Sequence, residues 1–218
     1  MRVNRSVWAL VMALMLAAAN PTGAQVRSPT PKRSPQPELT IEGGSSVGNI
    51  HVFAYAADRR INPFGIEYDR HSWGGLLGAR VDYVAEFLPV VLLNEPAAYG
   101  LDSRALTTAR RIHYGVGFSP VGVRLLWRRD SSFNPYLIGK GGLLYFTTHV
   151  LSADASKLNF SAQFGGGVQA RLRQGMDLRV GYTDFHFSNG DDSVRNPGID
   201  FMYLNAGLVF HLGAREAR

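Results

Sequence analysis

The sequence predicts an all-β protein, an eight-stranded antiparallel transmembrane β-barrel of a bacterial outer membrane. Three observations support this fold class. The chain begins like an exported protein, and its 218 residues include no cysteine. From Leu39 onward apolar and polar residues alternate repeatedly, and no stretch keeps a helical period. Alternation with period two places one set of side chains on each face of a strand.

The first 38 residues are predicted to lie outside the barrel. Residues 1–24 have the pattern of a signal peptide, with Arg2 and Arg5 before an apolar run at 7–19 that is too short to span a bilayer. Residues 25–38 contain four prolines among polar residues, which predicts an extended tether. The barrel is expected at 39–212, followed by a tail at 213–218.

The net charge of +6 is concentrated in this leading segment, because residues 39–218 carry a net charge of only +2. The folded part is therefore close to neutral, and no nucleic-acid partner is expected.

Eight segments have the length and patterning of strands. They are 39–47, 62–73, 79–93, 112–128, 134–148, 158–173, 176–188 and 199–212. The alternation is clearest in the last three. The segment at 112–128 changes face near Ser119-Pro120, which predicts a β-bulge, and the register of 134–148 is ambiguous.

Alternation alone also fits a soluble, lipocalin-like barrel with an apolar interior. Two features favour the membrane form. The strands are about ten residues or longer, as a tilted crossing requires. Their polar faces carry Arg, Asp and Glu at mid-strand, which suits a narrow lumen filled with paired charges while the apolar face meets lipid.

The predicted connections alternate in length. Those after the second, fourth and sixth strands are short, and the others are longer. Outer-membrane barrels have short periplasmic turns and longer extracellular loops. The seventh strand therefore runs outward, and the eighth begins at the extracellular rim.

This topology predicts a polar cluster on the outer wall. His186 and Ser188 share a face with the lipid-facing residues of 176–188, and Asp200 shares the lipid-facing side of the next strand. Polar groups facing lipid are costly, so the cluster is a candidate site. A hydroxyl, an imidazole and a carboxylate are the groups of a serine hydrolase, with Ser188 as nucleophile, His186 as base and Asp200 as the orienting acid. Asp184 lies on the same face as His186 and is the alternative acid.

Asn189 could donate a hydrogen bond to an oxyanion. The alternative reading of this stretch is structural, with Ser-Asn-Gly and Asn-Pro-Gly as turns. The remaining histidines lack the spacing of metal ligands, so no metal or cofactor is expected. They are His51, His71, His113, His149 and His211.

These residues resemble the signature of the outer-membrane lipid A 3-O-deacylases of the PagL type. The matching motif is His186-Phe-Ser-Asn followed by Asn196-Pro-Gly-Ile-Asp200, and the resemblance extends over roughly 62–212. The best-known members of the family have glutamate at the acid position, where this chain has Asp200.

The resemblance implies an outer-membrane esterase that hydrolyses the ester-linked 3-hydroxyacyl chain at position 3 of lipid A. Its partners would be lipid A or lipopolysaccharide and outer-membrane lipid, and the sequence leaves open whether it forms a homodimer. The alternative function is a non-enzymatic surface barrel, an adhesin or a structural anchor.

Overall fold

The computed structural model describes residues 36–47, 58–98, 105–127, 131–150, 155–190 and 198–213. The predicted signal peptide, most of the predicted tether and the last five residues of the tail lie outside the described residues, so these assignments stay predictions. In the part of the chain that the structure describes, no helix has the length and apolar character needed to cross a membrane.

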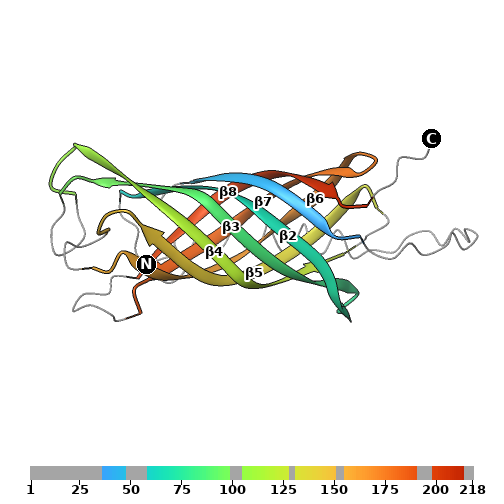
Figure 1. Ribbon diagram of the computed structural model, residues 1–218. Helices are drawn as coiled ribbons and strands as arrows, with labels where there is room; N and C mark the ends of the chain where they lie inside the picture. Colours follow the sequence, from blue (N-terminus) through green and yellow to red (C-terminus); the bar gives the residue numbers. More distant parts are fainter. Residues whose placement is uncertain are drawn as a thin grey trace, which may run out of the picture. The chain divides into compact units, whose positions relative to one another are not determined.

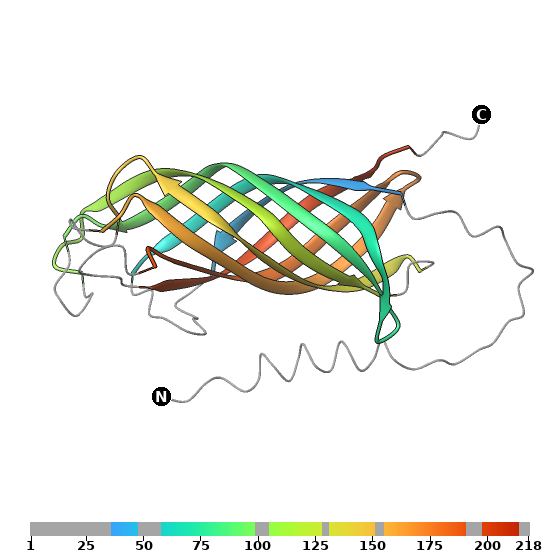
Figure 2. The ribbon, with the colours of Figure 1, turned by 60° about the horizontal axis from the view of Figure 1, so that its bottom comes forward.

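The described residues form a closed barrel in which each strand pairs antiparallel with its neighbours in sequence order (Figure 1). Pairing of β1 with β8 closes it, with Leu39 opposite Phe210. The strands are inclined to the barrel axis, as closure requires (Figure 2). Their bounds are β1 Glu38–Ser46, β2 Arg60–Leu76, β3 Ala79–Pro96, β4 Arg110–Leu126, β5 Phe133–Phe146, β6 Leu158–Arg173, β7 Met176–Ser188 and β8 Ile199–His211.

The eight predicted strands are confirmed, with small differences at their ends. β2 and β3 extend beyond the predicted segments, and β2 continues through Gly75 after a register shift that begins at His71. The predicted irregularity in β4 is present: the β4–β5 register shifts between Phe118 and Val121, around Ser119-Pro120. Proline lacks an N–H group for the ladder, so the strand deforms where it occurs.

The predicted alternation of connection lengths is confirmed. β2 and β3 are separated by Leu77 and Gly78 alone, and β6 and β7 by Gln174 and Gly175 alone. Both glycines have a φ of +77°, a left-handed conformation that suits a tight hairpin turn. By the outer-membrane rule, these turns mark the periplasmic end, and the longer connections mark the extracellular end.

The outer wall of the barrel is apolar, which excludes the soluble alternative. Large apolar side chains exposed on this wall include Phe64, Ile66, Phe118, Phe164, Val180 and Leu208. Near the periplasmic end, Trp73 and Tyr83 pack edge to face, with ring centroids 6.2 Å apart. Aromatic residues at this level are typical of the membrane interface.

The lumen nearer the periplasmic end is filled by paired charges, as predicted. Arg124 is fully buried, and its Nη atoms lie 2.8 Å from Glu38, 3.1 Å from Asp69 and 2.8 Å from Asp82. Arg179 lies 2.7 Å from Asp69 and also contacts Glu67. These pairs join strands that are far apart in sequence.

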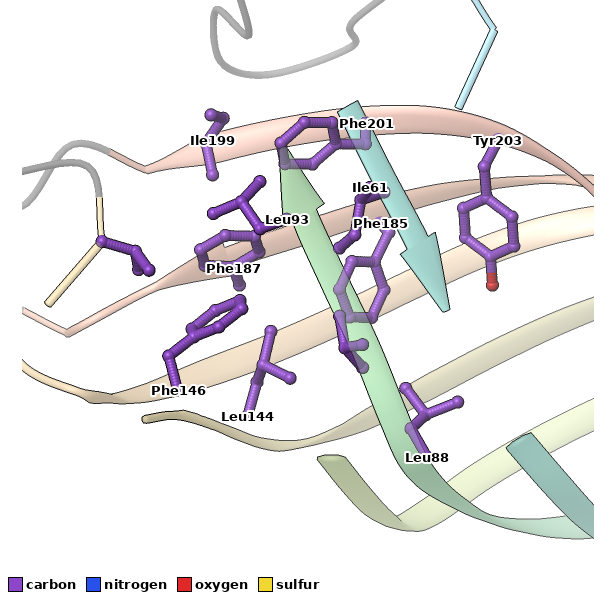
Figure 3. Close-up of a cluster of buried hydrophobic side chains, with 12 residues drawn as sticks. Ile61, Leu88, Leu93, Leu144, Phe146, Phe185, Phe187, Ile199, Phe201 and Tyr203 are labelled. Atoms are coloured by element: carbon purple, nitrogen blue, oxygen red, sulfur yellow. The ribbon is translucent and has the colours of Figure 1, made fainter. Parts of the chain in front are cut away.

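The lumen nearer the extracellular end is apolar, which the prediction of a polar lumen missed. Twelve buried side chains from five strands and one adjoining segment pack there, including Phe146, Phe185, Phe187, Phe201 and Tyr203 (Figure 3). A lumen this narrow is a packed core, so either kind of side chain can fill it. The outer ends of β7 and β8 are consequently held by aromatic packing.

Candidate active site

Alternation at the end of β7 separates two aromatic residues from two polar ones. Phe185 and Phe187 point into the barrel and are fully buried, while His186 and Ser188 face outward and are half-buried. The Phe187 ring stacks on Phe201 of β8, with centroids 6.0 Å apart and planes 16° apart. This packing holds the backbone of β7 in place from inside the barrel. The Cα positions of His186 and Ser188 on the outer wall are therefore fixed.

Register then brings the acid to the imidazole. His186 of β7 is directly opposite Asp200 of β8, and Nδ1 of the imidazole lies 2.5 Å from Oδ1 of the carboxylate. Asp200 is fully buried, whereas 32% of the His186 side chain is exposed. With Nδ1–H donating to the carboxylate, Nε2 of a neutral imidazole is the proton acceptor. This tautomer is the one that a general base requires.

Ser188 borders the same small space as the His186 imidazole. A Cβ atom placed on Gly198 would lie 3.0 Å from His186 Cε1, 3.5 Å from Nε2 and 3.9 Å from Ser188 Cβ. One point beside the backbone of Gly198 is thus close to both the imidazole and the serine. The absence of a side chain at this position keeps that space open.

The alternative acid, Asp184, lies further down the outer face of β7. It is opposite Met202 of β8 and Phe164 of β6, and it is also buried. The carboxylate of Asp200 meets the ring of His186. Asn189, the predicted oxyanion donor, directly follows Ser188 and is 3% exposed. Asn196 and Pro197 of the sequence motif lie outside the described residues.

β6 supplies an apolar wall beside the polar groups, which the sequence reasoning did not assign to the site. Phe160 is opposite Ser188, Ala162 is opposite His186, and Phe164 is opposite Asp184. The two phenylalanines are more than half exposed, and the small Ala162 lies between them. The alternation of the sequence could have indicated this wall, because all three residues belong to the lipid-facing set of β6.

The other histidines in the described residues have local partners. His113 Nδ1 lies 2.5 Å from the Thr148 hydroxyl, and His211 Nε2 lies 3.0 Å from Asp177. One buried group of carboxylates has the proximity of metal ligands, namely Glu42, Glu67 and Glu86. The Lys140 ammonium lies among them, 2.8 Å from Glu67, and supplies a positive charge to that group.

Comparison with known proteins identifies the kind of barrel. A family model described as lipid A 3-O-deacylase (PagL) matches residues 74–209, a range that includes Ser188, His186 and Asp200. The crystal structure of the outer membrane enzyme PagL is similar to this chain, with 17% identity, a TM-score of 0.54, and coverage of 78% of this chain and 97% of that one.

Two further solved structures are more distant. Neisserial surface protein A has 13% identity and a TM-score of 0.43, covering 82% of this chain and 97% of its own. The Yersinia pestis outer membrane protein Ail has 14% identity and a TM-score of 0.35, covering 81% of this chain and 100% of its own. No curated protein sequence matches the chain.

Proposed function

The chain belongs to the lipid A 3-O-deacylase (PagL) family of the outer membrane, and we propose that it cleaves its ester with Ser188, His186 and Asp200. The substrate of the proposed reaction is the ester-linked 3-hydroxyacyl chain at position 3 of lipid A. The observation that carries the proposal is the His186–Asp200 pair on the outer wall, beside Ser188 and at the extracellular end of the barrel.

The proposed reaction begins with the serine. His186 Nε2 takes the hydroxyl proton of Ser188 as Oγ attacks the ester carbonyl carbon, and Asp200 stabilises the imidazolium that forms. Asn189 is the proposed donor to the oxyanion of the tetrahedral intermediate. Collapse of this intermediate breaks the bond to the sugar oxygen, which receives the proton from His186. Water then attacks the acyl-enzyme, with His186 again as base, and the fatty acid leaves.

The location of the site suits a lipid substrate. Lipid A resides in the outer leaflet, and the three residues lie at the extracellular end of an apolar wall. An acyl chain can reach Ser188 from the bilayer without leaving its apolar surroundings. The exposed rings of Phe160 and Phe164 offer it a surface on β6.

The test is the mass of lipid A from cells that express each variant. Wild type should remove one 3-hydroxyacyl chain, and Ser188→Ala and His186→Asn should each reduce the rate by at least about a thousandfold, because the triad acts as a unit. Ser72→Ala is the matched control, since Ser72 is an exposed serine at the other end of the barrel. A Ser188→Ala variant that still deacylates lipid A would overturn the proposed mechanism.

A further inference from the structure

The charges of the barrel are distributed unevenly between its interior and its surface. Among the described residues ten acidic side chains are buried, and Asp58 is the exposed exception. Six arginines of the described ranges are exposed, namely Arg60, Arg70, Arg110, Arg111, Arg171 and Arg173. Among the described residues, the exposed charges are therefore mainly cationic, because the acids there are mostly inside.

Two of these arginines lie together on the outer wall at the extracellular rim. Arg60 begins β2 and Arg110 begins β4, and they flank the end of β3. Register places Arg60 opposite Asn94, and Arg110 opposite Pro96 two residues further along. Both have the parity of lipid-facing residues, Arg60 with Phe64 and Arg110 with Ile112.

The guanidinium of Arg110 is held in place over β3. Its Nε donates to Oδ1 of Asn94 at 2.7 Å, and its Nη2 donates to the backbone oxygen of Asn94 at 3.1 Å. These bonds use two of the five N–H donors of a guanidinium. Asn94 is also the partner of Arg60 in the ladder, so both arginines border this residue of β3 from its two sides.

The nearest acid on β3 does not neutralise this pair. Glu95 points inward and is 3% exposed, and its carboxylate is 3.0 Å from Arg59 and 3.0 Å from His113. Two like charges at a rim repel each other, and an external anion between them would relieve the repulsion. The guanidinium group of arginine binds phosphate through paired N–H donors.

The wall below the arginines is apolar. Phe64 is 48% exposed, Ile112 is 51% exposed and Tyr114 is 59% exposed. A cationic rim above an apolar wall matches a lipid with a phosphate headgroup and acyl chains. In an outer membrane, the extracellular rim lies at the level of the phosphates of lipid A.

We propose that the outer face of β2–β4 at the extracellular rim is a docking surface for an outer-leaflet lipid, with Arg60 and Arg110 binding its phosphate. This surface is separate from the proposed catalytic groups, which lie on β7 and β8. It binds a lipid that is not being hydrolysed and so fixes the depth and rotation of the barrel in the leaflet. The proposal rests on the membrane location and does not depend on the triad.

The test counts lipids bound to the refolded full chain by native mass spectrometry, in detergent, with every protein carrying Ser188→Ala to prevent turnover. The probes are diphosphorylated lipid A and the same lipid A without phosphates. Because mass distinguishes acylation states, bound lipid is counted even if Ser188 is not the nucleophile. Arg60→Gln/Arg110→Gln should weaken one diphosphoryl lipid A site at least about tenfold, since each arginine near an anionic headgroup contributes about 1 kcal/mol.

Two matched variants separate a site from a general charge effect. Arg60→Lys/Arg110→Lys should retain most of the binding, and Arg171→Gln/Arg173→Gln, which removes two charges at the other rim, should retain it fully. The proposal is overturned if the Arg60/Arg110 glutamine variant binds like its parent, if both glutamine pairs lose binding equally, or if lipid A without phosphates binds as well. Displacement of the lipid by millimolar inorganic phosphate would also contradict a lipid surface. Heat-modifiable gel mobility verifies that each variant is folded.

Discussion

At the scale of single residues, the two carboxylates near His186 have different positions. Asp200 meets Nδ1 at 2.5 Å from the directly opposite strand position, whereas Asp184 lies two residues back on the same strand as His186. We expect Asp200→Asn to reduce deacylation by about 10²–10⁴-fold, because an amide cannot hold the required tautomer. Asp184→Asn should cost less than about tenfold. Initial rates on lipid A in mixed micelles measure both, and a larger loss from Asp184→Asn would reverse the assignment.

The sequence alone places Ser188 and His186 on one face, but it leaves Asp200 and Asp184 as alternative acids. The serine and histidine belong to one strand, so alternation fixes their common face. The acid depends on the register between β7 and β8, and residues 189–198 join these strands through a connection whose length does not determine the pairing. The strand register pairs His186 with Asp200, and this pairing is the observation that favours Asp200 over Asp184 as the proposed acid.

At the scale of elements, the site requires the start of β8 to approach the end of β7 closely. The backbone at Gly198 lies against the His186 ring, where an added Cβ would be 3.0 Å from Cε1. We predict that Gly198→Val displaces the imidazole and lowers the deacylation rate by about 10²-fold, the cost of a misplacement near 1 Å. Gly139→Val is the control, because a Cβ there meets nothing closer than 3.9 Å. A fully active, folded Gly198→Val variant would show that this approach does not matter.

The positions of the strands were predictable to within a few residues, but the register of β5 was not. Alternation located all eight elements, and Pro120 marked the bulge in β4. The register of β5 was ambiguous because its inward face carries Tyr136, Ile138, Leu144 and Phe146 beside an outward face that is also apolar. Where both faces of a strand are apolar, the alternation of residues cannot show which face meets lipid.

At the scale of the whole molecule, closure was predictable and the division of the lumen was not. Eight strands joined by alternating short and long connections are enough to close a small barrel. The charged residues in the middle of the strands indicated a lumen filled by ion pairs. The apolar half, with Phe185, Phe187 and Phe201, was hidden because these residues alternate with the polar site residues on the same strands. The structure thus separates a charged half near the periplasm from an aromatic half that supports the site.

This separation predicts that stability and activity can be changed independently. Arg124 is fully buried and bonded to Glu38, Asp69 and Asp82 on three other strands. Arg124→Leu leaves those carboxylates without this cation, so we expect a loss of about 3–5 kcal/mol in the free energy of unfolding. Urea titration in vesicles, followed by heat-modifiable gel mobility, measures it. Arg171→Leu, at an exposed arginine, should change the same quantity by less than about 0.5 kcal/mol.

The rate per folded Arg124→Leu molecule should equal that of wild type, because the aromatic half of the lumen lies between the charged half and the outer ends of β7 and β8. If Arg124→Leu lowered the deacylation rate while the free energy of unfolding stayed unchanged, the two halves of the lumen would be coupled, and the independence inferred from their packing would be wrong.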